Sequence, residues 1–154
     1  VVELIHLATL VHDDVLDEAD VRRGKQTINN LRGNEAAVML GDYLLSSAFH
    51  LCSTIRNPAL NLLLGEVTNT VCAGEVVQLY HRNNVGLDLE SYYQIVHDKT
   101  ASLIAASCEM GAILGGVDED VSFVLKNMNP WQKFRNLRTR NPCVFPKAIQ
   151  TGYR

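Results

Sequence analysis

Residues 1–17, VVELIHLATLVHDDVLD, decide the fold of this chain. Apolar residues recur at three- and four-residue spacing as far as Leu16, which is typical of a helix with one buried face. Asp13 and Asp17 are one helical turn apart and share a face, with Asp14 beside them. The stretch therefore predicts a helix over 2–18 that ends in three crowded carboxylates.

Those carboxylates repel one another unless something positive offsets them. Magnesium takes one or two carboxylates and completes its shell with waters and substrate phosphates. Arg22 and Arg23, five and six residues after the last aspartate, could grip the same phosphate oxygens through their planar guanidinium groups. The pattern indicates a site for magnesium and a diphosphate. The structural alternative is a solvated acidic helix end followed by a basic turn.

The rest of the chain is also predicted to be helical. Helices are expected at 34–55, 58–81 and 88–115, with a weaker one at 118–127, because good helix formers carry apolar residues at helical spacing there. Pro58 can begin a helix, and Asp88 can cap one. Strand signals are scarce, so the predicted class is all-α.

Residues 3–24, ELIHLATLVHDDVLDEADVRRG, resemble the first aspartate-rich motif and flanks of the trans-prenyl diphosphate synthase family. That family builds linear isoprenoid diphosphates. Further matches follow in the same order at 33–34, 38–45, 74–79 and 99–101. The resemblance reaches about Gly116 and departs at Gln26, where the family usually has proline. It implies a helical bundle of the isoprenoid synthase type, here incomplete.

Two parts are expected along the chain: a partial synthase helical domain at 1–125 and a basic tail at 126–154. The net charge is −3, yet the tail holds seven of the 14 lysines and arginines and no acidic residue. Three prolines and no apolar period favour a non-family or disordered tail. The family's second aspartate-rich motif and its upstream basic site are not found, so the chain resembles part of a synthase. A nucleic-acid-binding arm is the alternative for the tail, but no nucleic-acid partner is expected.

The resemblance implies roles for the charged cluster. Asp13 and Asp17 would hold Mg²⁺, and Asp14 would support them directly or through the other ligands. Arg22 would contact the diphosphate of the allylic substrate, and Arg23 that of isopentenyl diphosphate.

The resemblance also implies a second diphosphate contact at Lys99 and Thr100. Lys99 would neutralise the leaving group as a catalytic residue, and Thr100 would orient it by a hydrogen bond. Gln78 would face the substrate cavity. Pairs on a helix surface are the structural alternative for Lys99 and Gln78. Ala8 and Thr9 occupy positions whose bulk limits product length in the family, and neither is aromatic, which favours a medium- or long-chain product.

Other residues are given structural interpretations. His12 has no partner at metal-ligand spacing and is expected to be a core or rim histidine, and Asp42 is expected to be buried and hydrogen-bonded. Cys52, Cys72 and Cys108 are expected to be buried, reduced thiols, which favours a cytoplasmic location. No apolar run is long enough to predict a transmembrane segment.

The resemblance implies a Mg²⁺-dependent prenyltransferase. It would condense an allylic diphosphate with isopentenyl diphosphate to make a medium- or long-chain polyprenyl diphosphate. We expect a homodimer or a heteromer with a complete synthase. The alternative is an inactive fragment or a non-catalytic subunit that pairs with a complete synthase. A terpene cyclase would share the aspartate motif, but the arginine pair favours chain elongation.

Overall fold

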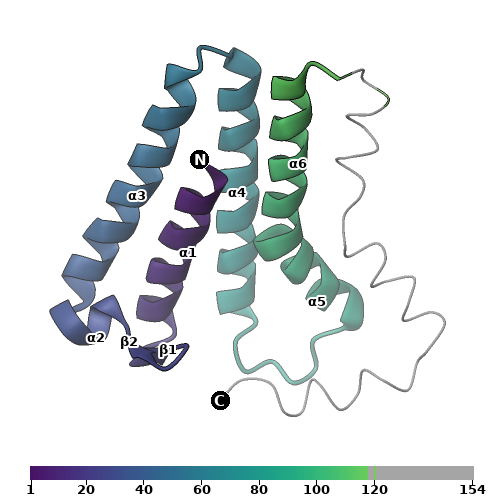
Figure 1. Cartoon of the computed structure of the whole chain (residues 1–154). Coiled ribbons are helices and arrows are strands. Elements are labelled where there is room, and N and C mark those ends of the chain that lie inside the picture. Colours follow the sequence, from purple (N-terminus) through teal and green to yellow (C-terminus); the bar gives the residue numbers. More distant parts are fainter. Residues whose placement is uncertain (118–119, 121–154) are drawn as a thin grey trace. The chain divides into compact units, whose positions relative to one another are not determined.

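The computed structural model describes residues 1–117 and 120 of the 154-residue chain. The described residues are mostly helical (Figure 1) and fall into two compact units. The first is Val1–Asn69 and the second begins at Thr70, so the boundary lies within helix α4 (Pro58–Tyr80). The predicted helix at 118–127, apart from residue 120, and the basic tail lie outside the described residues. Among the described helices, none is both long and apolar enough to cross a membrane.

The first unit is built around the contact between α1 (Val2–Leu16) and α3 (Asn34–Thr54). Small side chains allow close approach of helices, and Ala8 of α1 and Ala37 and Ala48 of α3 are buried in this unit. Its largest fully buried side chains are Ile5, Cys52, Leu60 and Leu64. Burial of each large aliphatic side chain contributes about 1.5–3 kcal/mol. The prediction of helices here is confirmed to within two residues at each end.

Helix α1 ends in a Schellman motif. The Glu18 N–H donates to Val15 O at 3.2 Å, and the Ala19 N–H donates to Asp14 O at 2.9 Å. Glu18 has φ +50°, the left-handed conformation that this position requires and that glycine usually supplies. The chain therefore turns back at once after Asp17.

A short hairpin follows that the sequence did not predict. Strands β1 (Val21–Arg22) and β2 (Lys25–Gln26) are antiparallel, with Arg22 opposite Lys25. The two turn residues, Arg23 and Gly24, have φ +51° and +76°, and type I′ turns require positive φ at both central positions. Strands of two residues carry no periodicity, which is why the sequence pattern misses them.

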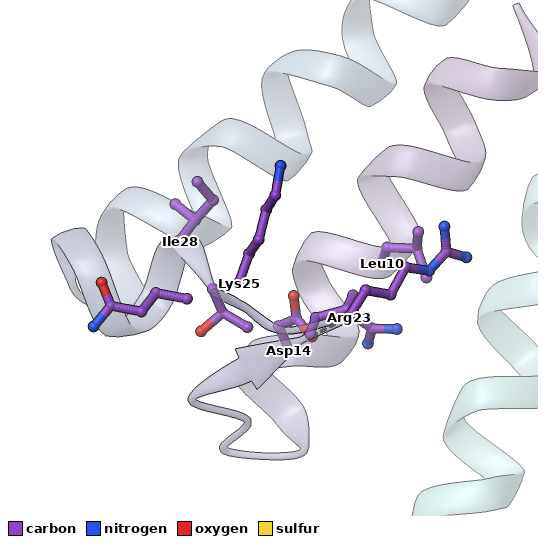
Figure 2. A pocket seen from close by; sticks show the side chains of 8 residues that line it. Leu10, Asp14, Arg23, Lys25 and Ile28 are labelled. Atoms are coloured by element: carbon purple, nitrogen blue, oxygen red, sulfur yellow. Dashed lines mark hydrogen bonds and ion pairs between the residues drawn. The ribbon is translucent and has the colours of Figure 1, made fainter.

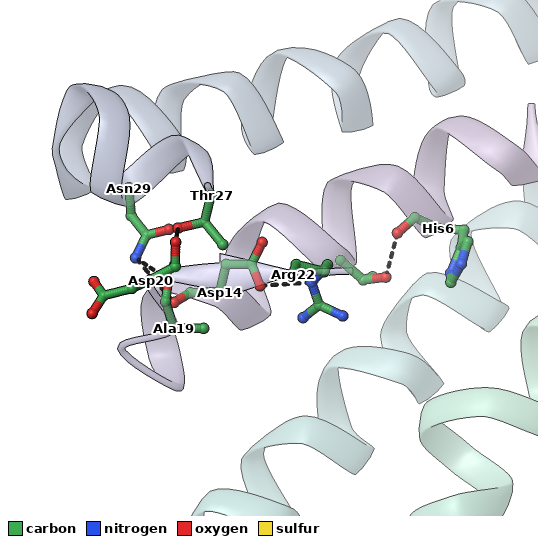
Figure 3. Close-up of polar contacts among 8 residues, drawn as sticks. His6, Asp14, Ala19, Asp20, Arg22, Thr27 and Asn29 are labelled. Carbon is green, nitrogen blue, oxygen red and sulfur yellow. Dashed lines mark hydrogen bonds and ion pairs between the residues drawn. The ribbon is translucent and has the colours of Figure 1, made fainter. Parts of the chain in front are cut away.

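Side chains of the short helix α2 (Ile28–Arg32) tie the end of α1 in place. The buried Thr27, at its N-cap, donates its hydroxyl to Ala19 O at 2.7 Å, with Asp20 O at 3.2 Å (Figure 3). Asn29 Nδ2 donates to Asp14 O at 3.3 Å and to Ala19 O at 3.1 Å. These bonds fix the backbone between α1 and α2.

The second unit contains the end of α4, α5 (Leu89–Val96), the π-helical turn η1 (His97–Ala101) and α6 (Ser102–Gly115). The single helix predicted over 88–115 is therefore interrupted by a π turn. Asp88 caps α5 as predicted, because its carboxylate accepts from the Ser91 N–H at 2.9 Å and the Ser91 hydroxyl at 2.7 Å. These bonds lower the pKa of Asp88.

The cysteines depart from expectation. Cys52 is buried, but Cys72 and Cys108 are exposed, and all three are free. The prediction of buried thiols is wrong for the last two because a small unit cannot bury every apolar face of its helices.

Candidate functional site

A partly buried ion pair joins the last turn of α1 to the hairpin. Asp14 is only 7% exposed, and its Oδ1 accepts a hydrogen bond from Arg22 Nε at 2.7 Å (Figure 3). A buried carboxylate is costly unless it is paired and hydrogen-bonded. The hairpin therefore holds Arg22 where it compensates Asp14.

Asp13 and Asp17 lie on the same last turn of α1. Asp13 is half-buried and Asp17 is exposed, and their i, i+4 spacing brings the two carboxylates onto one face. Within residues 1–117 and 120, no three His, Cys, Asp or Glu side chains are grouped so that they could hold a metal ion. Two carboxylates nevertheless suit Mg²⁺, which commonly completes its shell with waters and substrate phosphates. Asp14 is the most buried of the three, and Arg22 occupies one of its oxygens.

An open pocket of about 350 Å³ lies between the end of α1 and the hairpin. Figure 2 shows Asp14, Arg23 and Lys25 around it, together with Leu10 and Ile28. Arg22 also lines this pocket. One buried carboxylate and three cationic side chains give the pocket an excess of positive charge, which favours an anionic ligand.

Lys25 is a candidate that the motif-based prediction did not consider. The hairpin register places it directly opposite Arg22, and like charges at opposite positions destabilise a strand pair. A bound anion would relieve this repulsion. The basic run Arg22–Arg23–Gly24–Lys25 could have indicated Lys25 as a candidate from the sequence. Only the hairpin, however, brings the side chains of that run together at one pocket.

The second unit places Lys99 against Glu75. Lys99 lies in the π turn η1 and forms an ion pair with Glu75 Oε2 of α4, and the two side chains are 21% and 14% exposed. Thr100 is exposed and Gln78 of α4 is half-buried. Lys99 is thus paired with a residue of another helix rather than solvated on a helix surface, and it lies in a π turn, a feature frequent at functional sites.

The close approach of α4 and η1 depends on Gly74. A Cβ at this position would lie 2.9 Å from Asp98 Cβ and from the Lys99 backbone N. Any other residue would push the two segments apart. Gly74 therefore allows the neighbouring Glu75 to reach Lys99.

The residues assigned to chain length lie in α1. Ala8 is 2% exposed, within the core of the first unit. Thr9 is half-buried, and its hydroxyl donates to His6 O at 2.8 Å (Figure 3). Their role in product length stays a prediction.

His12, which precedes Asp13, contacts Asp42 of α3. His12 is half-buried, in agreement with a rim position. Asp42 of α3 is exposed, so the expectation of a buried carboxylate is wrong. Its Oδ1 lies 3.3 Å from His12 Nε2 of α1. Asp42 is exposed because it lies at the edge of the α1–α3 contact.

The first helix of this helical fold ends in an aspartate cluster beside a basic hairpin and a pocket lined by cationic side chains, and this combination is typical of helical isoprenoid synthases. Residues 1–130 match the model of the polyprenyl synthetase family, and the chain belongs to this family. It is 41% identical over 119 residues to heptaprenyl diphosphate synthase component 2 of Bacillus subtilis, which covers 77% of this chain and 34% of that protein. It is 39% identical over 115 residues to octaprenyl diphosphate synthase of Escherichia coli, covering 75% and 36%.

Solved structures agree. A decaprenyl diphosphate synthase from Rhodobacter capsulatus matches with a TM-score of 0.79 and 39% identity, over 81% of this chain and 38% of that one. A polyprenyl synthase from Caulobacter crescentus, complexed with calcium and isoprenyl diphosphate, matches with a TM-score of 0.79 and 38% identity, over the same shares of the two chains. These comparisons confirm the predicted all-α isoprenoid synthase fold. The chain spans about a third of the length of these curated relatives.

Proposed function

We propose that this chain is the part of a prenyltransferase that binds the diphosphate of an allylic substrate with Mg²⁺. The reaction would condense that substrate with isopentenyl diphosphate to give a medium- or long-chain polyprenyl diphosphate. The observation that carries the proposal is the Asp14–Arg22 pair, which lines a pocket together with Arg23 and Lys25, while Asp13 and Asp17 lie on the same last turn of α1 as Asp14. The names of the heptaprenyl, octaprenyl and decaprenyl synthases among its relatives support the product class.

In this reaction the protein must stabilise the diphosphate as it leaves. The carbon–oxygen bond of the allylic diphosphate breaks, and the bonding electrons leave with the diphosphate. The double bond of isopentenyl diphosphate then attacks the allylic cation, and a proton is lost. Fixed cationic groups aimed at the departing diphosphate lower this barrier most effectively.

The first unit would bind a diphosphate through the last turn of α1 and the hairpin. Asp13 and Asp17 would hold Mg²⁺, which when bound adds positive charge at the diphosphate oxygens. Asp14 orients Arg22 through Nε, and the four remaining N–H donors of that guanidinium can bind phosphate oxygens. Arg23, at the tip of the hairpin, would contact isopentenyl diphosphate.

Lys99 lies in the second unit, and its role is the one that the resemblance to the family implies. Its ammonium would neutralise the leaving group, with Thr100 orienting that group by a hydrogen bond and Gln78 facing the substrate. Glu75 compensates the ammonium when no diphosphate is bound. This pairing fits a lysine that must be held in place yet remain able to move towards an anion.

A non-catalytic subunit or inactive fragment that pairs with a complete synthase is the second candidate. The printed name of the Bacillus subtilis relative, a component 2, supports an assembly of different chains. A homodimer is the simpler assembly under the first proposal. The three free cysteines support a cytoplasmic location for either.

Turnover separates the two candidates. The 154-residue chain is incubated with an allylic diphosphate, radiolabelled isopentenyl diphosphate and Mg²⁺, and the extracted products are separated by chain length. Asp13→Ala should abolish turnover, whereas the exposed Asp20→Ala in the same segment should retain it. Mg²⁺-dependent diphosphate binding without turnover would favour the subunit, and neither activity nor binding would contradict both.

A further inference from the structure

One hydrogen-bonded contact fastens α1 to α3 next to the aspartates. His12 immediately precedes Asp13, and its Nε2 lies 3.2 Å from Val38 O and 3.3 Å from Asp42 Oδ1. Both of these atoms are acceptors, so Nε2 must carry the hydrogen and share it between them. The bond therefore needs an N–H donor at this position, whatever the charge of the ring.

Helix α3 has a gap at Gly41 that accommodates the His12 ring; this gap is called the seat of the ring. A Cβ on Gly41 would overlap the imidazole of His12, so the ring lies directly over the bare backbone of that glycine. Val38, Gly41 and Asp42 are spaced i, i+3 and i+4 and share one face of the helix. That face offers a carbonyl acceptor, a gap for the ring and a carboxylate acceptor.

Apart from Asp14, the buried residues of α1 and α3 are apolar side chains or glycine. Ala8 and Ala37 are small, and dispersion contacts of this kind are non-directional, so they leave slide and rotation of α1 weakly defined. A hydrogen bond weakens steeply as its geometry departs from linearity. The Arg22–Asp14 and Asn29–Asp14 bonds join this turn to the hairpin and to α2, whereas the His12 bond joins it directly to α3.

We infer that His12 is a positioning residue, which holds the last turn of α1, and with it Asp13 and Asp17, in a single place against α3. The inference deepens the proposed function and rests on it for the assignment of these aspartates to Mg²⁺. His12 itself contacts neither metal nor substrate in this account. It acts through the helix.

Three substitutions separate this role from general packing. His12→Ala removes the donor, whereas His12→Gln keeps an N–H donor at a similar reach. Gly41→Ala displaces the ring from its seat while leaving His12 present, and the displaced atoms are the far end of a flexible side chain. His6→Ala, an exposed histidine on the same helix, is the matched control.

Two readouts are taken on the full 154-residue chain. Amide hydrogen exchange of residues 10–17 is followed by mass spectrometry without metal. Binding of Mn²⁺, as a stand-in for Mg²⁺, is followed by electron paramagnetic resonance in the presence of inorganic diphosphate. His12→Ala and Gly41→Ala should speed the exchange and weaken Mn²⁺ binding by about tenfold, the effect typical of lost supporting hydrogen bonds around a metal site.

The controls make the outcome decisive. His12→Gln should recover most of the Mn²⁺ affinity and the slow exchange, His6→Ala should match the wild type, and the His12→Ala/Gly41→Ala double variant should be no weaker than either single one. Unchanged exchange in His12→Ala, or His12→Gln no better than His12→Ala, would overturn the inference. A wild-type chain that binds no Mn²⁺–diphosphate would instead refute the proposed function, and the exchange rates would still decide the role of His12.

Discussion

Arg22 donates a hydrogen bond from Nε to Oδ1 of Asp14 at 2.7 Å, and this contact links the hairpin to the last turn of α1. The carboxylate is buried while the guanidinium is partly exposed. The bond therefore compensates the buried carboxylate of Asp14. The other N–H groups of the Arg22 guanidinium remain available at the pocket that Arg22 lines.

Arg22→Met should lower the free energy of unfolding by about 1–3 kcal/mol, because it leaves the Asp14 carboxylate buried without its partner. It should also weaken diphosphate binding. Arg23→Met, at the exposed turn of the same hairpin, should weaken diphosphate binding with little change in stability. Urea unfolding followed by circular dichroism measures the first effect and titration calorimetry the second. Equal stability of the two variants would contradict the role given to the Asp14–Arg22 bond.

Two glycines of α4 should respond to alanine with opposite signs. Gly74→Ala places a Cβ 2.9 Å from the backbone N of Lys99, and such overpacking costs about 1–3 kcal/mol. Gly65→Ala meets nothing within 4 Å and should stabilise the helix by about 0.5–1 kcal/mol. Urea midpoints at constant m-value test both. A neutral Gly74→Ala would mean that the α4–η1 contact is looser than described.

The Lys99–Glu75 pair should behave as a coupled unit. Lys99→Met leaves the Glu75 carboxylate, 14% exposed, without its cation, and should destabilise the chain by about 1–3 kcal/mol. Adding Glu75→Gln should restore most of that loss, because the neutral amide is cheaper to bury. A double-mutant cycle of unfolding free energies measures the coupling. Additive effects of the two substitutions would show that the ion pair contributes nothing.

Asp88 should give α5 a dependence on acid. The Ser91 N–H and hydroxyl hold the pKa of Asp88 below its ordinary value of about 3.9. A carboxylate with a lowered folded-state pKa contributes stability that is present above the unfolded pKa and lost as pH falls through the folded value. Below about pH 4 the start of α5 should therefore fray, which the Ser91 amide chemical shift reports. Asp88→Asn, which keeps an acceptor but cannot titrate, should abolish this dependence, and a retained dependence would place its origin elsewhere.

Much of the fold follows from the sequence because its helices are long and strongly periodic. The positions of α1, α3 and α4 were predicted to within two residues, and the cap at Asp88 was predicted from its residue type. The π turn at 97–101 was not, because the residues there have no local pattern that separates a π turn from an α-helix; the turn packs against α4 at Gly74. Periodicity reports one face of one helix and carries no information about its neighbour.

Most residues of the candidate site were predicted from the sequence, but their contacts and burial were not. The aspartates and Arg22 were named from their spacing, yet their division into one buried, paired carboxylate and two more accessible ones depends on the hairpin. That hairpin consists of two-residue strands around a left-handed Arg23, which no propensity favours. Lys25 was missed because the hairpin brings it to the pocket, and the His12–Asp42 contact was missed because it depends on the packing of α1 against α3.

The central claim is that the last turn of α1 and the hairpin together bind Mg²⁺ and diphosphate. Titration calorimetry of inorganic diphosphate into the 154-residue chain, with and without Mg²⁺, tests it most directly. We expect binding that needs Mg²⁺, that disappears in an Asp13→Ala/Asp17→Ala variant and that persists in Asp20→Ala. Diphosphate binding that is equally strong in the double variant, or absent from the wild-type chain at millimolar Mg²⁺, would contradict the account.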